Sequence, residues 1–152
     1  MTSPNTSPRY QALLQVLRTA DTLWNASRVF FARWDISPSQ FNVLNLLSGR
    51  PEGLSQTELG RFLLTHRSNV TGLVDRLEKR GLLGRHENSG DRRAYRVVLT
   101  AAGKKLLEAI VPEFHSLAEG VWKGTSARRL RELQADLAGL ARSAERLTEE
   151  DA

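Results

Sequence analysis

Hydroxyl, amide and basic side chains gather between positions 67 and 79 of the chain. On a helical wheel the apolar residues of this stretch fall on one side, and the other side carries Ser68, Gly72, Asp75 and Lys79, flanked by Thr71, Asn69 and Arg76. Side chains of Ser, Thr and Asn can hydrogen-bond to base edges, and those of Arg and Lys can reach phosphates. The stretch therefore predicts a helix that lies in the major groove of duplex DNA, with a merely solvated helix face as the alternative.

The candidate DNA contacts of this helix divide by their chemistry. Bases would be read by Ser68, Asn69 and Thr71, and phosphates would be held by Arg67, Arg76 and Lys79. Gly72 would let the backbone approach the DNA closely, but it can read no base.

A basic turn follows the helix in sequence. Asn88-Ser89-Gly90-Asp91 is a turn signal, and Arg92 and Arg93 come directly after it. A long guanidinium can enter a narrow minor groove, where the potential is most negative. Both arginines are candidate DNA contacts, and a solvated turn in which Arg93 pairs with Asp91 is the alternative.

Asp75 is an unusual residue for a helix near phosphates, because its carboxylate repels them. We expect Asp75 to pair with Arg93, so that Asp75 and Asp91 position the turn beside the helix. Recognition of cytosine by Asp75 is the alternative.

Charge and composition favour the same function class. Residues 54–105 contain 11 Lys or Arg and 5 Asp or Glu, a net of +6, whereas the rest of the chain, with 11 basic and 12 acidic residues, nets −1. This excess disfavours a module that contacts only protein. The absence of cysteine excludes disulfides and thiolate sites. His66, His86 and His115 lack metal-ligand spacing, and no phosphate loop or nucleophile elbow is present, so we expect no metal, cofactor or enzymatic activity.

Local signals define the elements around these residues. Ser37-Pro38-Ser39-Gln40 and Ser55-Gln56-Thr57-Glu58 are capping boxes that begin two helices, and Thr65 can cap a third, which ends near Arg80. Gly81 suits a left-handed cap, and strands are predicted at 82–87 and 94–99. Three helices followed by one hairpin are the order of a winged helix-turn-helix.

Long helices are predicted on both sides of this module. Apolar residues cover two faces of the helix at 9–33, and a heptad seam follows the last helix through Leu130, Leu133, Leu137, Leu140, Ala144 and Leu147. Such surfaces need a partner, so we expect a homodimer built from both chain ends. Pro112 is expected to kink the helix that Thr100 caps.

Three motifs carry a family resemblance. They are Leu54-Ser-Gln-Thr-Glu-Leu-Gly, Ser68-Asn-Val-Thr-Gly-Leu-Val-Asp-Arg-Leu-Glu-Lys-Arg-Gly-Leu, and Asp91-Arg-Arg with Val97-Val-Leu-Thr-Ala-Ala-Gly. Together they resemble the MarR family (multiple antibiotic resistance regulators), with one difference at Gly72, where many members carry a larger, often basic residue. The resemblance implies a triangular homodimer with one winged module per subunit, and repression that a small ligand or a chemical signal relieves.

The resemblance and the patterns give one expected architecture. It is a mainly α fold: a disordered tail at 1–8, then a single domain at 9–152, in which residues 37–103 form the winged helix-turn-helix and 9–35 and 104–149 the dimerisation helices. Family members often bind small aromatic or lipophilic molecules near the junction of these parts. Trp24, Phe30, Phe31 and Trp34 offer aromatic surface there, with ordinary core packing as the alternative. No membrane span or signal pattern is present, so we expect a cytoplasmic protein.

Overall fold

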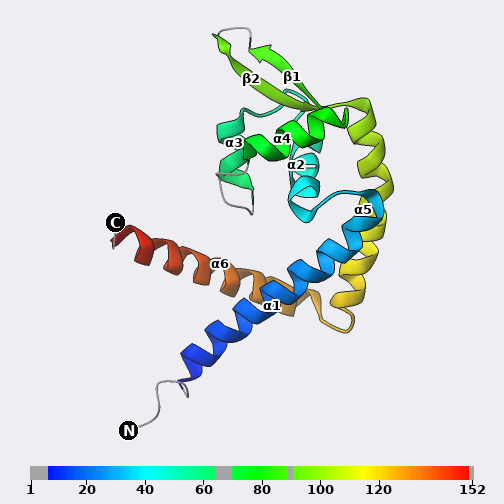
Figure 1. Cartoon of the computed structure of the whole chain (residues 1–152). Coiled ribbons are helices and arrows are strands. Elements are labelled where there is room, and N and C mark those ends of the chain that lie inside the picture. The colour runs from blue at the N-terminus through cyan, green and yellow to red at the C-terminus, as the bar shows by residue number, and fades with distance from the viewer. Residues whose placement is uncertain (1–6, 64–69, 89–90, 151–152) are drawn as a thin grey trace. The chain divides into compact units, whose positions relative to one another are not determined.

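The computed structural model describes residues 7–63, 70–88 and 91–150, with the backbone alone at 87, 88, 91–94 and 148–150. Its elements are, in chain order, α1 (Pro8–Phe31), the 3-10 helix η2 (Ala32–Trp34), α2 (Pro38–Ser48), α3 (Gln56–Phe62), α4 (Val70–Lys79), β1 (Leu83–Asn88), β2 (Asp91–Leu99), α5 (Ala101–Val121) and α6 (Ala127–Glu150) (Figure 1). The predicted class, mainly α with a small β-hairpin, is confirmed. Thr65, the predicted cap, lies outside the described residues.

The chain divides into two compact units, Met1–Ala109 and Ile110–Ala152. The core of the first unit is formed by apolar side chains of its α-helices and of both strands of the hairpin. Its most deeply buried side chains are Phe31, Val43, Leu44, Leu47, Leu59, Val74, Leu77 and Val97. Phe31 stacks on Phe41 with the ring centroids 4.4 Å apart, which fixes the end of α1 against α2.

Both predicted capping boxes are confirmed. The Gln40 amide donates to the Ser37 hydroxyl at 3.1 Å, and the Ser37 amide donates to the Gln40 side chain at 2.8 Å. Ser55 and Glu58 repeat the arrangement at 3.2 and 2.7 Å. Because the Ser55 amide and hydroxyl both bond to the Glu58 carboxylate, they hold the pKa of Glu58 below its ordinary value of 4.5. The boxes fix the residues at which α2 and α3 begin.

The hairpin is antiparallel, and its root is tied to the loop before α3. Leu83 pairs with Leu99 and Glu87 with Tyr95, and β2 begins at Asp91, three residues earlier than predicted. Leu54 bridges to Val97 through two backbone hydrogen bonds of 3.0 and 2.7 Å. Gly53 has a φ of 70°, and a Cβ at this position would overlap the Val97 carbonyl. Glycine is therefore required where the loop meets the strand.

Gly81 and Thr100 join the hairpin to the helices on either side of it. Gly81 has the left-handed φ of 70° that the sequence predicts after α4. The Thr100 hydroxyl donates to the Gly81 carbonyl at 2.7 Å and accepts from the Gly103 amide at 3.1 Å. The predicted cap at Thr100 is confirmed, and it also holds the first turn of α5 to the end of α4.

The second unit contains α5 from Ile110 onward and α6. Within it α5 continues through Pro112, and its bend there stays a prediction. Gly124 has a φ of 84° in the turn between the two helices. Leu137, Leu140 and Leu147 of the predicted heptad seam are exposed. Within the described ranges, no helix is both long enough and apolar enough to cross a membrane.

Candidate nucleic-acid interface

The outward side of α4 carries the predicted DNA contacts that the structure describes. Val70, Leu73, Val74 and Leu77 are all buried, which turns the opposite side of the helix away from the core. Thr71, Arg76 and Lys79 are exposed there, and Gly72 and Asp75 are half-buried. Arg67, Ser68 and Asn69 lie outside the described residues, directly before α4.

The backbone of Asp91, Arg92 and Arg93 begins strand β2 next to the hairpin turn, and the side chains of these residues lie outside what the structure describes. The assignment of one arginine to the minor groove, and that of Asp91 to positioning the turn, therefore stay predictions.

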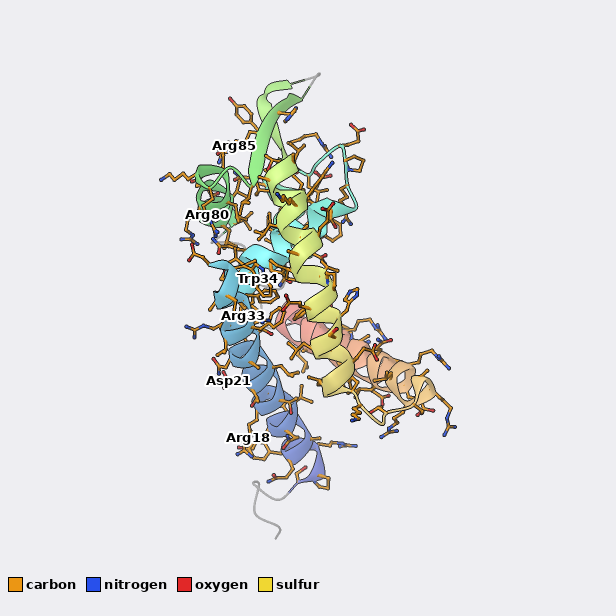
Figure 2. All side chains as sticks on the ribbon, turned by 90° about the vertical axis from the view of Figure 1, so that its right-hand side faces the viewer. Arg18, Asp21, Arg33, Trp34, Arg80 and Arg85 are labelled. Atoms are coloured by element: carbon orange, nitrogen blue, oxygen red, sulfur yellow. The ribbon has the colours of Figure 1, made fainter. Side chains whose placement is uncertain are left out.

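Asp75 has a partner that the sequence pattern does not predict. Arg85 of β1, labelled in Figure 2, donates from Nη2 to Asp75 Oδ1. Its Nε lies 3.4 Å from Glu78 Oε2, one turn further along α4. The expected pairing of Asp75 with Arg93 stays untested because the Arg93 side chain is not described. Arg85 neutralises two acids of α4 at once and holds the hairpin to the helix. The only signal for it in the sequence is a basic residue at a strand position.

Arg96 anchors the hairpin from its other strand. Its Nε donates to the Glu52 carbonyl at 2.9 Å and its Nη2 donates to the Gly53 carbonyl at 2.7 Å. The same Nη2 lies 3.7 Å from Glu58 Oε2. Arg96 thus joins the hairpin to the loop before α3, beside the Leu54 bridge, a role that the sequence pattern does not predict.

The last turn of α4 is tied to the end of α1. Arg80, which follows α4, donates from Nη1 to the Asp35 carbonyl and from Nη2 to the Trp34 carbonyl, the second at 3.3 Å (Figure 2). Its Nη2 also lies 3.7 Å from the Asp35 carboxylate. Asp35 has a φ of 53°, which a residue with a Cβ seldom adopts, and this turns its carbonyl and that of Trp34 toward Arg80.

Three of the four candidate ligand-binding aromatics lie together at the end of α1. Phe30 is 5.0 Å from Phe31 and 5.2 Å from Trp34, measured between ring centroids. Phe31 is buried in the core, whereas Phe30 and Trp34 are half-buried and the Arg33 guanidinium lies over both of their rings. Trp24 is exposed, further back on α1. A hollow of about 310 Å³ opens at the same junction, lined by Arg28, Ala32, Asp35, Ile36, Ser37, Pro38 and Gln40.

Among the residues that the structure describes, no three His, Asp or Glu side chains lie close enough together to bind a metal ion.

Comparison with known proteins shows where this arrangement recurs. The profile of the MarR family matches residues 34–94, which run from η2 to the hairpin. The transcriptional regulator HosA of Escherichia coli O157:H7 is 31% identical over 93 residues, covering 58% of this chain and 68% of HosA. The chain belongs to the MarR family.

Two further proteins, one similar in sequence and one in structure, add detail. The transcriptional repressor MprA of Escherichia coli is 30% identical over 92 residues, which are 60% of this chain and 52% of MprA, so the match spans about half of that repressor. The solved structure of Bordetella bronchiseptica BpsR, whose DNA binding is regulated by 6-hydroxynicotinic acid, has a TM-score of 0.76 at 21% identity, with 93% of this chain and 97% of BpsR covered. The structural similarity to BpsR shows that this chain has the same fold, the winged helix of the MarR family. HosA and MprA are named as regulators of transcription, in agreement with the expectation that the chain is not an enzyme.

The Asp75–Arg85 pair predicts a measurable coupling in stability. The free energy of unfolding of Asp75→Asn, Arg85→Met and the double variant should show a coupling of about 0.5–1 kcal/mol, since the two side chains are only 31% and 46% exposed. The control is the cycle Arg128→Met with Glu132→Gln, an exposed pair on α6, for which we expect a coupling of less than about 0.5 kcal/mol. Additive effects of the Asp75 and Arg85 substitutions, with coupling in an Arg93→Met cycle instead, would restore Arg93 as the partner.

Proposed function

We propose that this chain is a transcriptional regulator, acting as a repressor in the cytoplasm, that binds a pseudo-palindromic operator in duplex DNA as a homodimer. The observation that carries the proposal is the outward side of α4, where Thr71, Arg76 and Lys79 are exposed. Arg85 neutralises the carboxylates of Asp75 and Glu78 on the same helix. Repression is proposed from MprA, which is named a repressor.

The two DNA-contacting parts would divide the work of recognition. Helix α4 would enter the major groove with Ser68, Asn69 and Thr71 toward the bases, and Arg67, Arg76 and Lys79 toward phosphates. The hairpin would bring Arg92 and Arg93 to the adjacent minor groove. Because Arg85 and Arg96 hold the hairpin at both strands, its angle to α4 is set before DNA binds.

The salt dependence of binding tests the hairpin contacts. The double variant Arg92→Ala with Arg93→Ala should weaken binding to every duplex sequence and flatten the slope of log affinity against log salt by about 0.9 for each lost phosphate contact. The matched control, Arg128→Ala with Arg129→Ala, removes the same charge from exposed positions of α6 and should leave the slope unchanged. Equal slopes for wild type and the hairpin variant would show that the hairpin does not touch DNA.

The dimer is proposed from uncovered apolar surface on both end helices. Leu13 and Leu17 of α1 are exposed, as are Leu137, Leu140 and Leu147 of α6. Rows of apolar side chains at heptad spacing are typical of helices that pack on another helix. A two-fold dimer would also place two copies of α4 about 34 Å apart, the distance between successive major grooves on one side of DNA.

Light scattering tests this assembly. The wild-type chain should have the mass of a dimer at micromolar concentration, and Leu137→Asp with Leu140→Asp should shift it toward a monomer, because the substitutions place charges in the seam. Ala135→Asp with Ala138→Asp puts the same charges on the opposite side of α6 and should leave the dimer intact. A monomeric wild type would contradict the proposal.

Ligand control is proposed from the aromatic residues at the end of α1. Regulation of BpsR by 6-hydroxynicotinic acid makes a small aromatic acid or phenol a reasonable ligand class for a similar fold. Phe30 and Trp34 are half-buried beside the Arg33 guanidinium, which could attract an acidic group. Arg80 bonds to the Trp34 carbonyl, so a molecule that displaces Trp34 would also disturb the end of α4.

Fluorescence titration tests this control. 6-Hydroxynicotinic acid and phenol should quench tryptophan emission, Trp34→Phe should remove most of that quenching, and operator DNA should weaken ligand binding by the factor by which ligand weakens DNA binding. Arg80→Met should retain the quenching but reduce this factor. Trp122→Phe, at an exposed position outside the four candidate residues, is the matched control and should leave the quenching in place. Quenching that is identical with and without operator DNA would show that ligand and DNA binding are uncoupled.

A further inference from the structure

We propose that Gln56 of α3 determines which base Thr71 of α4 recognises, and that the two side chains together select adenine. The inference rests on the proposed DNA binding, and it assigns a role to a residue outside α4 and the hairpin. It starts from one contact: the Thr71 hydroxyl donates to Gln56 Oε1 at 2.9 Å, across 15 positions of sequence.

The pair lies on the outward side of the helix-turn-helix. Thr71 is exposed in the first described turn of α4, and Gln56 is the half-buried first residue of α3. Both border an open hollow of about 340 Å³ between the two helices, which is also lined by Thr57, Gly60, Arg61 and Val70. The two side chains therefore face a space that a base edge or a phosphate can enter.

Gln56 is held in place by its neighbours in sequence. The preceding residue, Ser55, forms the capping box with Glu58, and Leu54 is fixed to Val97 of the hairpin. Only the side-chain torsions of Gln56 remain to be set, and the bond to Thr71 restrains them. Because the capping box and the Leu54 bridge hold the backbone beside Gln56, its side chain can orient the Thr71 hydroxyl before DNA binds.

The direction of the hydrogen bond determines what Thr71 can recognise. A hydroxyl has a single hydrogen, and here it points to Gln56, so the Thr71 oxygen presents only lone pairs to an incoming base. In the major groove the groups that donate to such an acceptor are the N6 amino group of adenine and the N4 amino group of cytosine. Guanine and thymine present acceptors at the corresponding places and are disfavoured.

The Gln56 amide narrows this choice to one base. Its Nε2 group has two N–H donors, and no contact among the described residues uses them. Thr71 and Gln56 thus present an acceptor beside a donor. Adenine presents the complementary pair on a single base, the N6 donor beside the N7 acceptor. Cytosine carries no major-groove acceptor of its own, and the acceptor beside its amino group is O6 of the paired guanine, on the opposite side from that of adenine N7.

In vitro selection from random duplex DNA tests the pair. The full-length wild-type chain should enrich adenine over other bases at one position of each half-site, by about tenfold or more. Thr71→Val, which removes only the hydroxyl, and Gln56→Ala should both lose the preference at that position. Gln56→Glu keeps an acceptor for the Thr71 hydroxyl but has no N–H, so it should change the preference from adenine to cytosine. Thr57→Ala, which alters the same hollow without touching the pair, should leave the preference unchanged.

The outcomes separate this inference from the proposed function. If the wild-type chain binds no duplex DNA, the proposed function fails. If it enriches an operator but Thr71→Val and Gln56→Ala change different positions, or weaken all sequences alike, the pairing inference alone fails. A wild-type preference for guanine at the shared position would also overturn it, because guanine presents no major-groove donor to the Thr71 oxygen. Circular dichroism of each variant checks that the fold is retained.

Discussion

Burial of the apolar side of α4 is the constraint on which the rest of the module depends. Val70, Leu73, Val74 and Leu77 are each at most 4% exposed, and fully burying such a side chain contributes about 1.5–3 kcal/mol. A helix so short has little stability of its own, so this packing both forms it and sets its rotation. Rotation by a single residue would exchange buried and exposed positions. The same four side chains therefore determine that Thr71, Arg76 and Lys79 face outward.

Polar contacts then fix what apolar packing leaves adjustable. Arg80 joins the last turn of α4 to the backbone at the end of α1, and Arg85 joins its outward side to the hairpin. Thr71 contacts α3 at the other end of the helix. Helix α4 is thus linked to three other elements by side chains at its two ends and on its outward side. A displacement of α1 or of the hairpin would be transmitted to the proposed DNA-reading surface through identifiable hydrogen bonds.

The sequence predicted those features that local chemistry decides. The capping boxes at Ser37 and Ser55, the left-handed Gly81 and the order of three helices and a hairpin all depend on residues a few positions apart. It did not identify the partners of Arg85, Arg96 and Arg80, which are 7 to 46 positions away in sequence. An arginine can reach many acceptors, and only the packed fold selects among them. For the same reason the sequence places Gln56 within a capping box and does not predict its contact with Thr71.

The backbone bridge between Leu54 and Val97 also has a consequence for the order in which the chain folds. The neighbouring hydrogen bond from Arg96 to Gly53 spans 43 positions of sequence. Formation of the bridge therefore closes a long loop, and the chain between its ends loses conformational entropy when the bridge forms. The pairing of β1 with β2 and the contacts of α4 with β1 close much shorter loops and can form early. Attachment of the hairpin root would then be a late step on the folding pathway. Substitutions at Gly53 should accordingly accelerate unfolding far more than they slow refolding.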